Sequence, residues 1–267
     1  ISHAAILAND LLNVYYDRYE PAIGLHVEEE LEFLAPVFVG ERVTIRGRYV
    51  DKRVRRGMGQ LIMEAEAIGA DGRVLVRHRG VEVMEIASVA EGGGRSAEVA
   101  GPRVTGEIDP RRRPVVRARA GLVPGTPVRP WWRHIAQEQA SVYSYCGMFQ
   151  RNIHNDLETA RGAGLERTIV QGQQLACHVS GYLTAFFGAA WFTSGRVRLK
   201  FIAPVSPGQS ISVHAVVTGE TPTPGGPRVE LDTWIRDASG TLVVVGWASA
   251  RLDASVAERQ AGNPQEG

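Results

Sequence analysis

The chain contains the octapeptide FLAPVFVG at residues 33–40 and a close copy of it, FIAPVSPG, at residues 201–208. The two copies are 168 residues apart, and the same offset aligns the chain with itself without a gap from residue 1 to about residue 85. Leu7 then matches Leu175. Because one register holds over such a length, the sequence indicates an internal duplication.

Each copy predicts a buried helix followed by an antiparallel sheet. The helices are expected over residues 3–17 and 171–187, and the second is apolar nearly all round, as buried helices are. Asp71-Gly72 and Ser239-Gly240 predict hairpin turns. Period-two alternation and β-branched residues predict the strands of the second copy at 196–202, 209–219, 227–236 and 241–252. Each unit is therefore of the α+β class, and two such units in one chain can pair their sheets as a homodimer would.

The remaining segments predict the domain organisation. Glycines, prolines and the basic run Arg111–Arg113 predict a linker between the copies. That basic run suits either a solvated loop or the phosphates of a coenzyme. The chain begins at Ile1, and we expect the first unit to be incomplete at its start. The expected parts are an N-terminal unit at 1–87, a linker at 88–127, a C-terminal unit at 128–254 and a flexible tail at 255–267.

Composition excludes several classes of protein. The 30 Lys and Arg residues balance 29 Asp and Glu residues, so the net charge gives no argument for nucleic acid or an anionic membrane. Two cysteines, Cys146 and Cys177, imply no disulfide framework, and we expect a cytoplasmic protein. No apolar run is expected to reach the length that spans a bilayer, and no ligand spacing predicts a metal site.

The segment ahead of the second copy has no counterpart ahead of the first. A helix is expected from about His134 to Cys146, followed by Ile153-His154-Asn155-Asp156. Asp156 is the expected N-cap of a short helix that ends near residue 161. Thr168-Ile169-Val170-Gln171-Gly172 then enters the second buried helix.

This order of motifs resembles the MaoC-like (R)-specific enoyl hydratases and 3-hydroxyacyl dehydratases. The shared features are the Ile-His-x-Asp element, the Ile-Val-x-Gly helix start and the Phe-x-Ala-Pro-Val-x-x-Gly strand start in both copies. The resemblance covers nearly the whole chain. It implies a tandem (double) hotdog fold, in which each antiparallel sheet wraps around its buried helix.

The resemblance also implies a hydro-lyase that interconverts (R)-3-hydroxyacyl and trans-2-enoyl thioesters without a cofactor. The acyl carrier would be coenzyme A or acyl carrier protein. His154 is the candidate acid and base, because an imidazole titrates near neutrality. The backbone N–H of Gly172 is the candidate donor to the enolate oxygen, because a helix N-terminus has unpaired N–H groups and a positive dipole end. A structural role for His154 or for Gly172 stays open.

The chain departs from the family at the second catalytic group. The hydratases carry Ser-Gly-Asp-x-Asn-Pro-x-His, whereas Cys146-Gly147 precede Met148 and Phe149 here. The acid that shares the water with the histidine is therefore not visible. The candidate substrate-binding residues, some of which could substitute for it, are Tyr143, Gln150, Asn152, Asn155, Gln171 and His3.

The first copy predicts a non-catalytic half. Its equivalent of Gly172 is Ala4, and small helix residues would leave room for an acyl group. Cys177 and His178 are expected in the core or lining the pocket. Two other readings stay open: an isomerase or cyclase that uses one base, and a non-catalytic acyl-binding partner subunit. A homodimer or a heteromer of double-hotdog chains is the expected assembly.

Overall fold

The computed structural model describes residues 1–14, 24–55, 58–84, 104–144 and 150–252. Its strands form one nine-stranded antiparallel sheet in the order β2-β3-β4-β1-β6-β9-β8-β7-β5. The strands run as follows: β1 Gly24–Phe33, β2 Val43–Arg55, β3 Met58–Gly69, β4 Val74–Met84, β5 Pro127–Ile135, β6 Arg196–Phe201, β7 Gln209–Thr221, β8 Arg228–Arg236 and β9 Leu242–Arg251.

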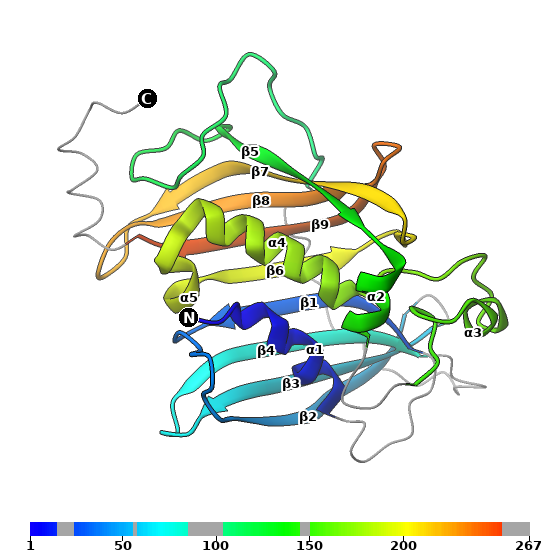
Figure 1. The fold of residues 1–267 in the computed structure, drawn as a ribbon. Helices are drawn as coiled ribbons and strands as arrows, with labels where there is room; N and C mark the ends of the chain where they lie inside the picture. Colours follow the sequence, from blue (N-terminus) through cyan, green and yellow to red (C-terminus); the bar gives the residue numbers. More distant parts are fainter. Residues whose placement is uncertain (15–23, 56–57, 85–103, 145–149, 253–267) are drawn as a thin grey trace.

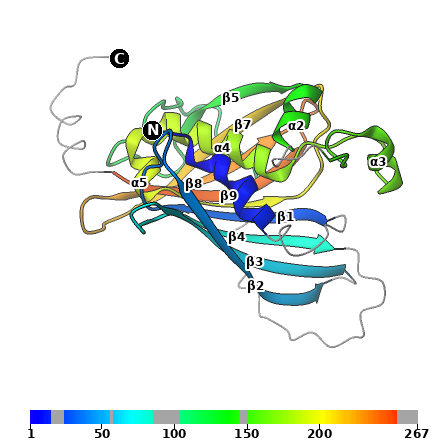
Figure 2. The ribbon, with the colours of Figure 1, turned by 60° about the horizontal axis from the view of Figure 1, so that its bottom comes forward.

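The helices gather on one side of this sheet (Figures 1 and 2). A 3-10 turn, Ala4–Ile6, leads into α1, Leu7–Asn13, and the long helix α4 is Gly172–Phe187. Another 3-10 turn, Gly188–Ala190, leads on to α5, Trp191–Ser194. Two short helices, α2 Gln137–Tyr143 and α3 Leu157–Gly162, precede α4.

The duplication is visible in the sheet. Strands β2-β3-β4-β1 form one half and β6-β9-β8-β7 the other, and they meet at the antiparallel pair β1 and β6. Gly72 and Gly240 occupy equivalent hairpin turns with φ of 83° and 85°, which glycine adopts without strain. The α+β double-unit architecture predicted from the repeat is therefore confirmed.

Helix α4 is the centre of the core. Its buried positions pack against inward-facing residues of β6 to β9, and residues of α1 join the same cluster. The largest of the buried α4 side chains are Leu175, Val179, Tyr182, Leu183, Phe186 and Phe187. The strand bounds predicted for the second copy agree with β6 to β9 within two residues.

Two expectations about elements need correction. The helix expected from His134 to Cys146 is α2, which begins only at Gln137, because the preceding residues form β5. Pro127 and Pro130 conceal this strand in the sequence, yet β5 is an edge strand with a bulge, where proline is tolerated. The first helix is expected at residues 3–17. The structure has a 3-10 turn and an α-helix over residues 4–13, and residues 15–17 lie outside the described residues.

The linker expected at 88–127 also differs from a free loop in the part that is described. Val104, Ala118 and Leu122 are buried, and the Ala118 N–H donates to the carbonyl of Phe186 at the end of α4. Arg111 pairs with Asp109 on the surface, so the basic run itself is solvated. Residues 104–126 therefore pack on the C-terminal half.

One helical run is apolar enough by length and composition to cross a membrane. It is the 23-residue run Gly172–Ser194, which contains an 18-residue window of mean hydropathy 1.2, so the expectation that no run approaches the length needed to span a bilayer is wrong. Half of its most apolar window is buried inside the molecule. A core helix that is apolar nearly all round passes the same test.

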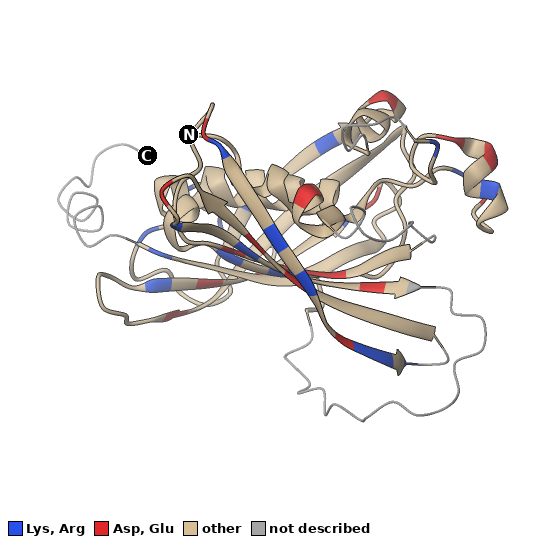
Figure 3. Cartoon of the chain, turned by 90° about the horizontal axis from the view of Figure 1, so that it is seen from below, with Lys and Arg blue, Asp and Glu red and all other residues tan. Residues whose placement is uncertain are grey.

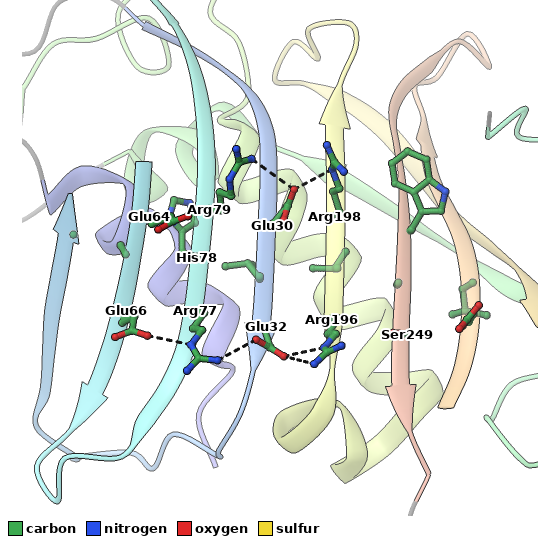
Figure 4. Close-up of a pocket in the computed structure, with 18 of the residues that line it drawn as sticks. Glu30, Glu32, Glu64, Glu66, Arg77, His78, Arg79, Arg196, Arg198 and Ser249 are labelled. Atoms are coloured by element: carbon green, nitrogen blue, oxygen red, sulfur yellow. Dashed lines mark hydrogen bonds and ion pairs between the residues drawn. The ribbon is translucent and has the colours of Figure 1, made fainter. Parts of the chain in front are cut away.

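The outer face of the sheet is charged and hollowed. A groove of about 1150 Å³ extends over this face from β2 to β7 in the order of the sheet, with acidic and basic side chains on its walls (Figure 4). Figure 3 shows basic and acidic segments interspersed along the strands rather than gathered by sign. The outward side chains therefore pair mainly with each other.

Candidate active site

A tight loop between α2 and α3 holds His154. The side chain of Asn152 accepts from the His154 N–H at 2.8 Å, and the side chain of Asn155 accepts from the Asn152 N–H at 3.0 Å. Such Asx contacts fix the backbone of a turn. Asp156 follows and caps α3, because its Oδ1 accepts from the Thr159 N–H at 2.8 Å. The predicted N-cap is therefore confirmed.

The imidazole of His154 has a defined tautomer. Its Nδ1 lies 2.8 Å from the carbonyl oxygen of Ile169. Because a carbonyl only accepts, Nδ1 carries the proton, and Nε2 of the neutral ring is left as a bare acceptor. Burial lowers the pKa of His154, outweighing the Ile169 bond, which raises it. The ring is therefore neutral at pH 7 and suited to act as a base.

Gln137 ties the His154 loop to the segment that enters α4. Its Nε2 donates to the His154 carbonyl at 2.8 Å, and its Oε1 accepts from the Thr168 hydroxyl at 2.6 Å. The Ile169 N–H also donates to the carbonyl of Ile153 at 3.2 Å. The candidate base and the residues leading to Gly172 are thereby held in one hydrogen-bonded unit.

Gly172 is the first residue of α4. Gln171 is the N-cap and its side chain makes no capping hydrogen bond, so the first turn keeps the unpaired N–H groups of a helix start. A Cβ on Gly172 would lie 3.2 Å from the Phe201 ring and 3.4 Å from Cδ2 of His26. Glycine therefore leaves room beside the amide that the sequence assigned to the enolate oxygen.

Tyr143 reaches the same helix from α2. Its hydroxyl lies 3.3 Å from the thiol of Cys177, which in turn donates to the carbonyl of Ala5 at 3.2 Å. Burial raises the pKa of Cys177 to about 11 and raises that of Tyr143 well above its usual range. Both groups are therefore neutral and can donate hydrogen bonds but not attack as nucleophiles.

The other predicted substrate-binding residues fall into different roles. Asn152 and Asn155 use their side chains on the loop itself, and both amides donate to the carbonyl of Gln150. The Gln150 side chain is exposed. Gln171 has a buried Oε1 that lacks a hydrogen-bond partner among the described residues.

His3 does not join this group. Its Nε2 would lie 3.7 Å from a Cβ on Gly181, which is nine residues beyond Gly172 in α4. At 1.5 Å per residue, that is roughly 13 Å along the helix from the candidate oxyanion donor. His3 therefore faces the middle of α4 and lies away from the helix start.

A pocket of about 480 Å³ opens beside the His154 loop. Arg161 and Arg167 are among its lining residues, and Gln137 connects it to the His154 loop through the His154 carbonyl. Its lining consists of Gln137, Asn155, Leu157, Arg161, Glu166, Arg167, Thr168, Ser206 and Pro207.

The positions that carry the departure from the family, Cys146 to Phe149, lie outside the described residues. Within the described ranges, no group of three or more His, Cys, Asp or Glu side chains is arranged to hold a metal ion.

Sequence analysis missed one polar group near the helix start, His26, because it belongs to the half expected to be non-catalytic. Its proximity to Gly172 depends on the pairing of the two sheets, which no local motif encodes.

Comparisons with known proteins agree with this architecture. The family model described as MaoC like domain matches residues 119–232. No curated protein sequence matches the chain significantly. A solved MaoC-like dehydratase superposes with a TM-score of 0.70 at 15% identity, covering 94% of this chain and 83% of that chain.

Two further solved structures share the fold. Full-length peroxisomal multifunctional enzyme type 2 from Drosophila melanogaster superposes with a TM-score of 0.62 at 18% identity, covering 94% of this chain and 41% of that chain. A conserved hypothetical protein from Mycobacterium tuberculosis, described as a double hotdog fold, gives 0.61 at 16% identity, with coverage of 94% and 82%. Residues 119–232 therefore match the MaoC like domain, and the chain has the double hotdog fold.

Proposed function

We propose that the chain is a hydro-lyase that interconverts (R)-3-hydroxyacyl and trans-2-enoyl thioesters. His154 is the acid and base, and the N–H of Gly172 holds the enolate oxygen. The observation that carries this proposal is the bond from His154 Nδ1 to the Ile169 carbonyl, which leaves Nε2 as a base and ties the His154 loop to the segment that opens α4. The names of the family and of the solved relatives support the same class of reaction.

In hydration, Nε2 of His154 takes a proton from water while the water oxygen forms a bond to C3 of the enoyl group. The electron pair of the C2–C3 double bond moves toward the thioester, and the resulting enolate oxygen accepts from the Gly172 N–H. The imidazolium formed in the first step then supplies the proton to C2. Dehydration follows the same path in reverse, with loss of water from C3.

The carrier of the thioester would enter beside the same loop. The 480 Å³ pocket is lined by Gln137, Asn155, Arg161 and Arg167, among others. Both coenzyme A and the prosthetic arm of acyl carrier protein contain a phosphate, which guanidinium groups bind well. This arrangement supports a carrier-linked acyl thioester as the substrate.

The proposal is tested with crotonyl-CoA and with longer and branched enoyl-CoA substrates, by following the loss of enoyl absorbance and an increase of one water in product mass. The variant His154→Ala is expected to lose roughly 10²–10⁴-fold in kcat/KM. The exposed His134→Ala is the matched control and keeps wild-type activity.

Other outcomes would contradict the proposal. A product of unchanged mass would indicate an isomerase or cyclase that uses the one base. Acyl-thioester binding without turnover would indicate a non-catalytic binding subunit. Equal activity of His154→Ala and the wild-type chain would remove His154 from the mechanism.

A further inference from the structure

Three titratable side chains meet inside the N-terminal half. Oε2 of Glu29 lies 2.6 Å from Nε2 of His26 and 3.2 Å from Nε2 of His78. The side chains of these residues are 0%, 5% and 0% exposed, respectively. We call His26, Glu29 and His78 the polar cluster.

Local backbone structure builds this cluster. A β-bulge between His26 and Glu28 shifts the register of β1, so that His26 and Glu29 point to the same face despite their odd spacing. Gly80 on β4 pairs with Glu29, and a Cβ there would lie 2.9 Å from Cε1 of His78 and 3.0 Å from Cε1 of His26. Only glycine leaves space for both imidazoles beside the carboxylate.

The scaffold does not need this cluster. At the offset of 168, the equivalent positions in the C-terminal half are Ser194, Val197 and Gly246, and that half forms the same strands. A buried charge is costly, and apolar residues often serve a core as well or better. The N-terminal half therefore has a buried polar cluster that is absent from the equivalent positions of the C-terminal half.

Part of the hydrogen-bonding capacity of the cluster is unused. Burial alone would raise the pKa of Glu29, but His78 and His26 outweigh it and hold that pKa at about 2. An ionised carboxylate only accepts, so each imidazole donates through Nε2. The Nδ1 atoms of His26 and His78 and Oε1 of Glu29 are buried and lack a hydrogen-bond partner among the described residues.

The cluster adjoins the start of α4. The rings of His26 and Phe201 are the nearest side-chain groups to a Cβ placed on Gly172. Glu29 also raises the pKa of Tyr143 and of Cys177 electrostatically, although burial is the larger cause for both. The cluster therefore lies next to the residue that the proposed function assigns to the thioester carbonyl.

We propose that His26, Glu29 and His78 form a subsite for a hydroxyl group on the acyl chain beyond C3, so that the substrates are hydroxylated acyl thioesters. This inference rests on the proposed function, which places the thioester at Gly172 and the C3 oxygen at His154. A hydroxyl fits because it donates to Oε1 of Glu29 or to an Nδ1 atom that lacks a hydrogen-bond partner among the described residues. A plain alkyl chain would leave these buried atoms unsatisfied.

The test compares (E)-hex-2-enoyl-CoA with its 4-, 5- and 6-hydroxy derivatives. The wild-type chain is expected to favour at least one hydroxylated substrate by on the order of 100-fold or more in kcat/KM, since sites built for a hydroxyl reject analogues that lack it. The triple variant His26→Ser, Glu29→Val, His78→Gly copies the C-terminal half, and its preference should fall below about 5-fold. Glu30→Val, on the opposite face of the same strand, is the matched control and keeps the wild-type ratio.

A binding experiment separates this inference from the proposed function. Calorimetry with the saturated probes 5-hydroxyhexanoyl-CoA and hexanoyl-CoA is run on His154→Ala, with and without the triple change. Tighter binding of the hydroxylated probe by at least about 10-fold, lost in the triple variant, supports the subsite even if no turnover is found. Circular dichroism and melting verify folding, and Glu29→Gln, which keeps the side-chain shape, is the second variant.

An unchanged substrate ratio in the variants, or a uniform loss over all substrates, would overturn the subsite. Preference for an amino-substituted over a hydroxylated acyl chain would overturn it as well, because the cluster would then be a cation site.

Discussion

Glu30 lies directly opposite Arg198 where β1 of the N-terminal half pairs with β6 of the C-terminal half, which we call the seam. The two positions are also 168 residues apart, so they are equivalent in the repeat. The two residues therefore sit on the local two-fold relationship of the duplicated chain. Arg198 Nε lies 3.0 Å from Glu30 Oε1, and Figure 4 shows Glu30 between Arg198 and Arg79. A homodimer of identical units would place the same residue at both positions, with like charges in contact.

The other outward-facing pairs of the seam also have an acidic residue on β1 and a basic residue on β6. The outward residues of β1 are acidic, Glu28, Glu30 and Glu32, and their partners on β6 are basic, Arg196, Arg198 and Lys200. Arg196 pairs with Glu32 at 2.6 Å. Pairing β1 with β1 or β6 with β6 would oppose like charges, which destabilises adjacent strands. The charges thus favour pairing of the two halves within one chain.

This relationship predicts the effect of charge reversal at the seam. Arg198→Glu should lower the free energy of unfolding by about 1 kcal/mol, since both side chains are roughly 40% exposed and solvent weakens the pair. Glu30→Arg combined with Arg198→Glu should regain about half of the loss. Urea unfolding of the two single variants and the double variant measures the coupling. If the free energy of unfolding of the double variant equals the value expected from adding the two single effects, a specific interaction between Glu30 and Arg198 is contradicted.

The fold could be predicted from the sequence because the duplication repeats signals that are local. The octapeptide, the glycine hairpins at Gly72 and Gly240 and the apolar run of α4 each appear within a few residues. Strand β5 could not be predicted, because Pro127 and Pro130 are tolerated only through its edge position on β7. That position is a property of the assembled sheet.

The site divides in the same way. The loop of His154 and the cap at Asp156 depend on neighbouring residues, and the structure has both. The polar cluster joins His26 and Glu29 with His78, 49 positions after Glu29 in the chain. Three consecutive acids, Glu28–Glu30, give no alternation that shows which one points inward, and the bulge beside them alters the count.

Gly172 allows a direct test of the oxyanion donor. Gly172→Ala keeps the N–H and adds a Cβ that crowds the Phe201 ring, so kcat should fall by no more than about 10-fold. Gly172→Pro removes the N–H at the first helical position, where proline is tolerated, and Gln171 already has the extended ψ of 140° that precedes proline. A further loss of roughly 10²–10³ in kcat is expected. Single-turnover kinetics on both variants measure the difference, and equal losses would show that the amide donates to nothing in the transition state.

His154 predicts the acid side of the pH profile for hydration. Its neutral ring is the active base, and burial lowers its pKa from 6.5, so kcat/KM should rise with pH and reach half its plateau below pH 6.5. The profile is measured from pH 4.5 to 8 in buffers of constant ionic strength, on an enoyl-CoA substrate. The residual activity of His154→Ala should not show this rise of kcat/KM with pH. A midpoint above 6.5 would mean that a different group titrates.

Glu29 predicts how stability depends on acid. Its pKa is lowered from 4.5 to about 2 in the folded chain, because the attraction of His78 and His26 exceeds the penalty of burial. A lowered carboxyl pKa contributes stability that is complete above pH 4.5 and is lost as pH falls toward 2, because the unfolded chain binds the proton first. Glu29→Gln should therefore be less stable than wild type by about 3 kcal/mol at pH 7, and the two should converge near pH 2.

Chemical denaturation of both proteins at half-unit steps from pH 7 to 2 measures this difference. Glu32→Gln, on the outer face of the same strand, is the matched control, because its carboxylate is partly exposed and its pairs with Arg77 and Arg196 are weakened by solvent. The control should follow the wild-type curve within about 1 kcal/mol over the whole range. A constant gap between wild type and Glu29→Gln down to pH 2 would show that Glu29 stabilises the fold through its shape and not through its charge.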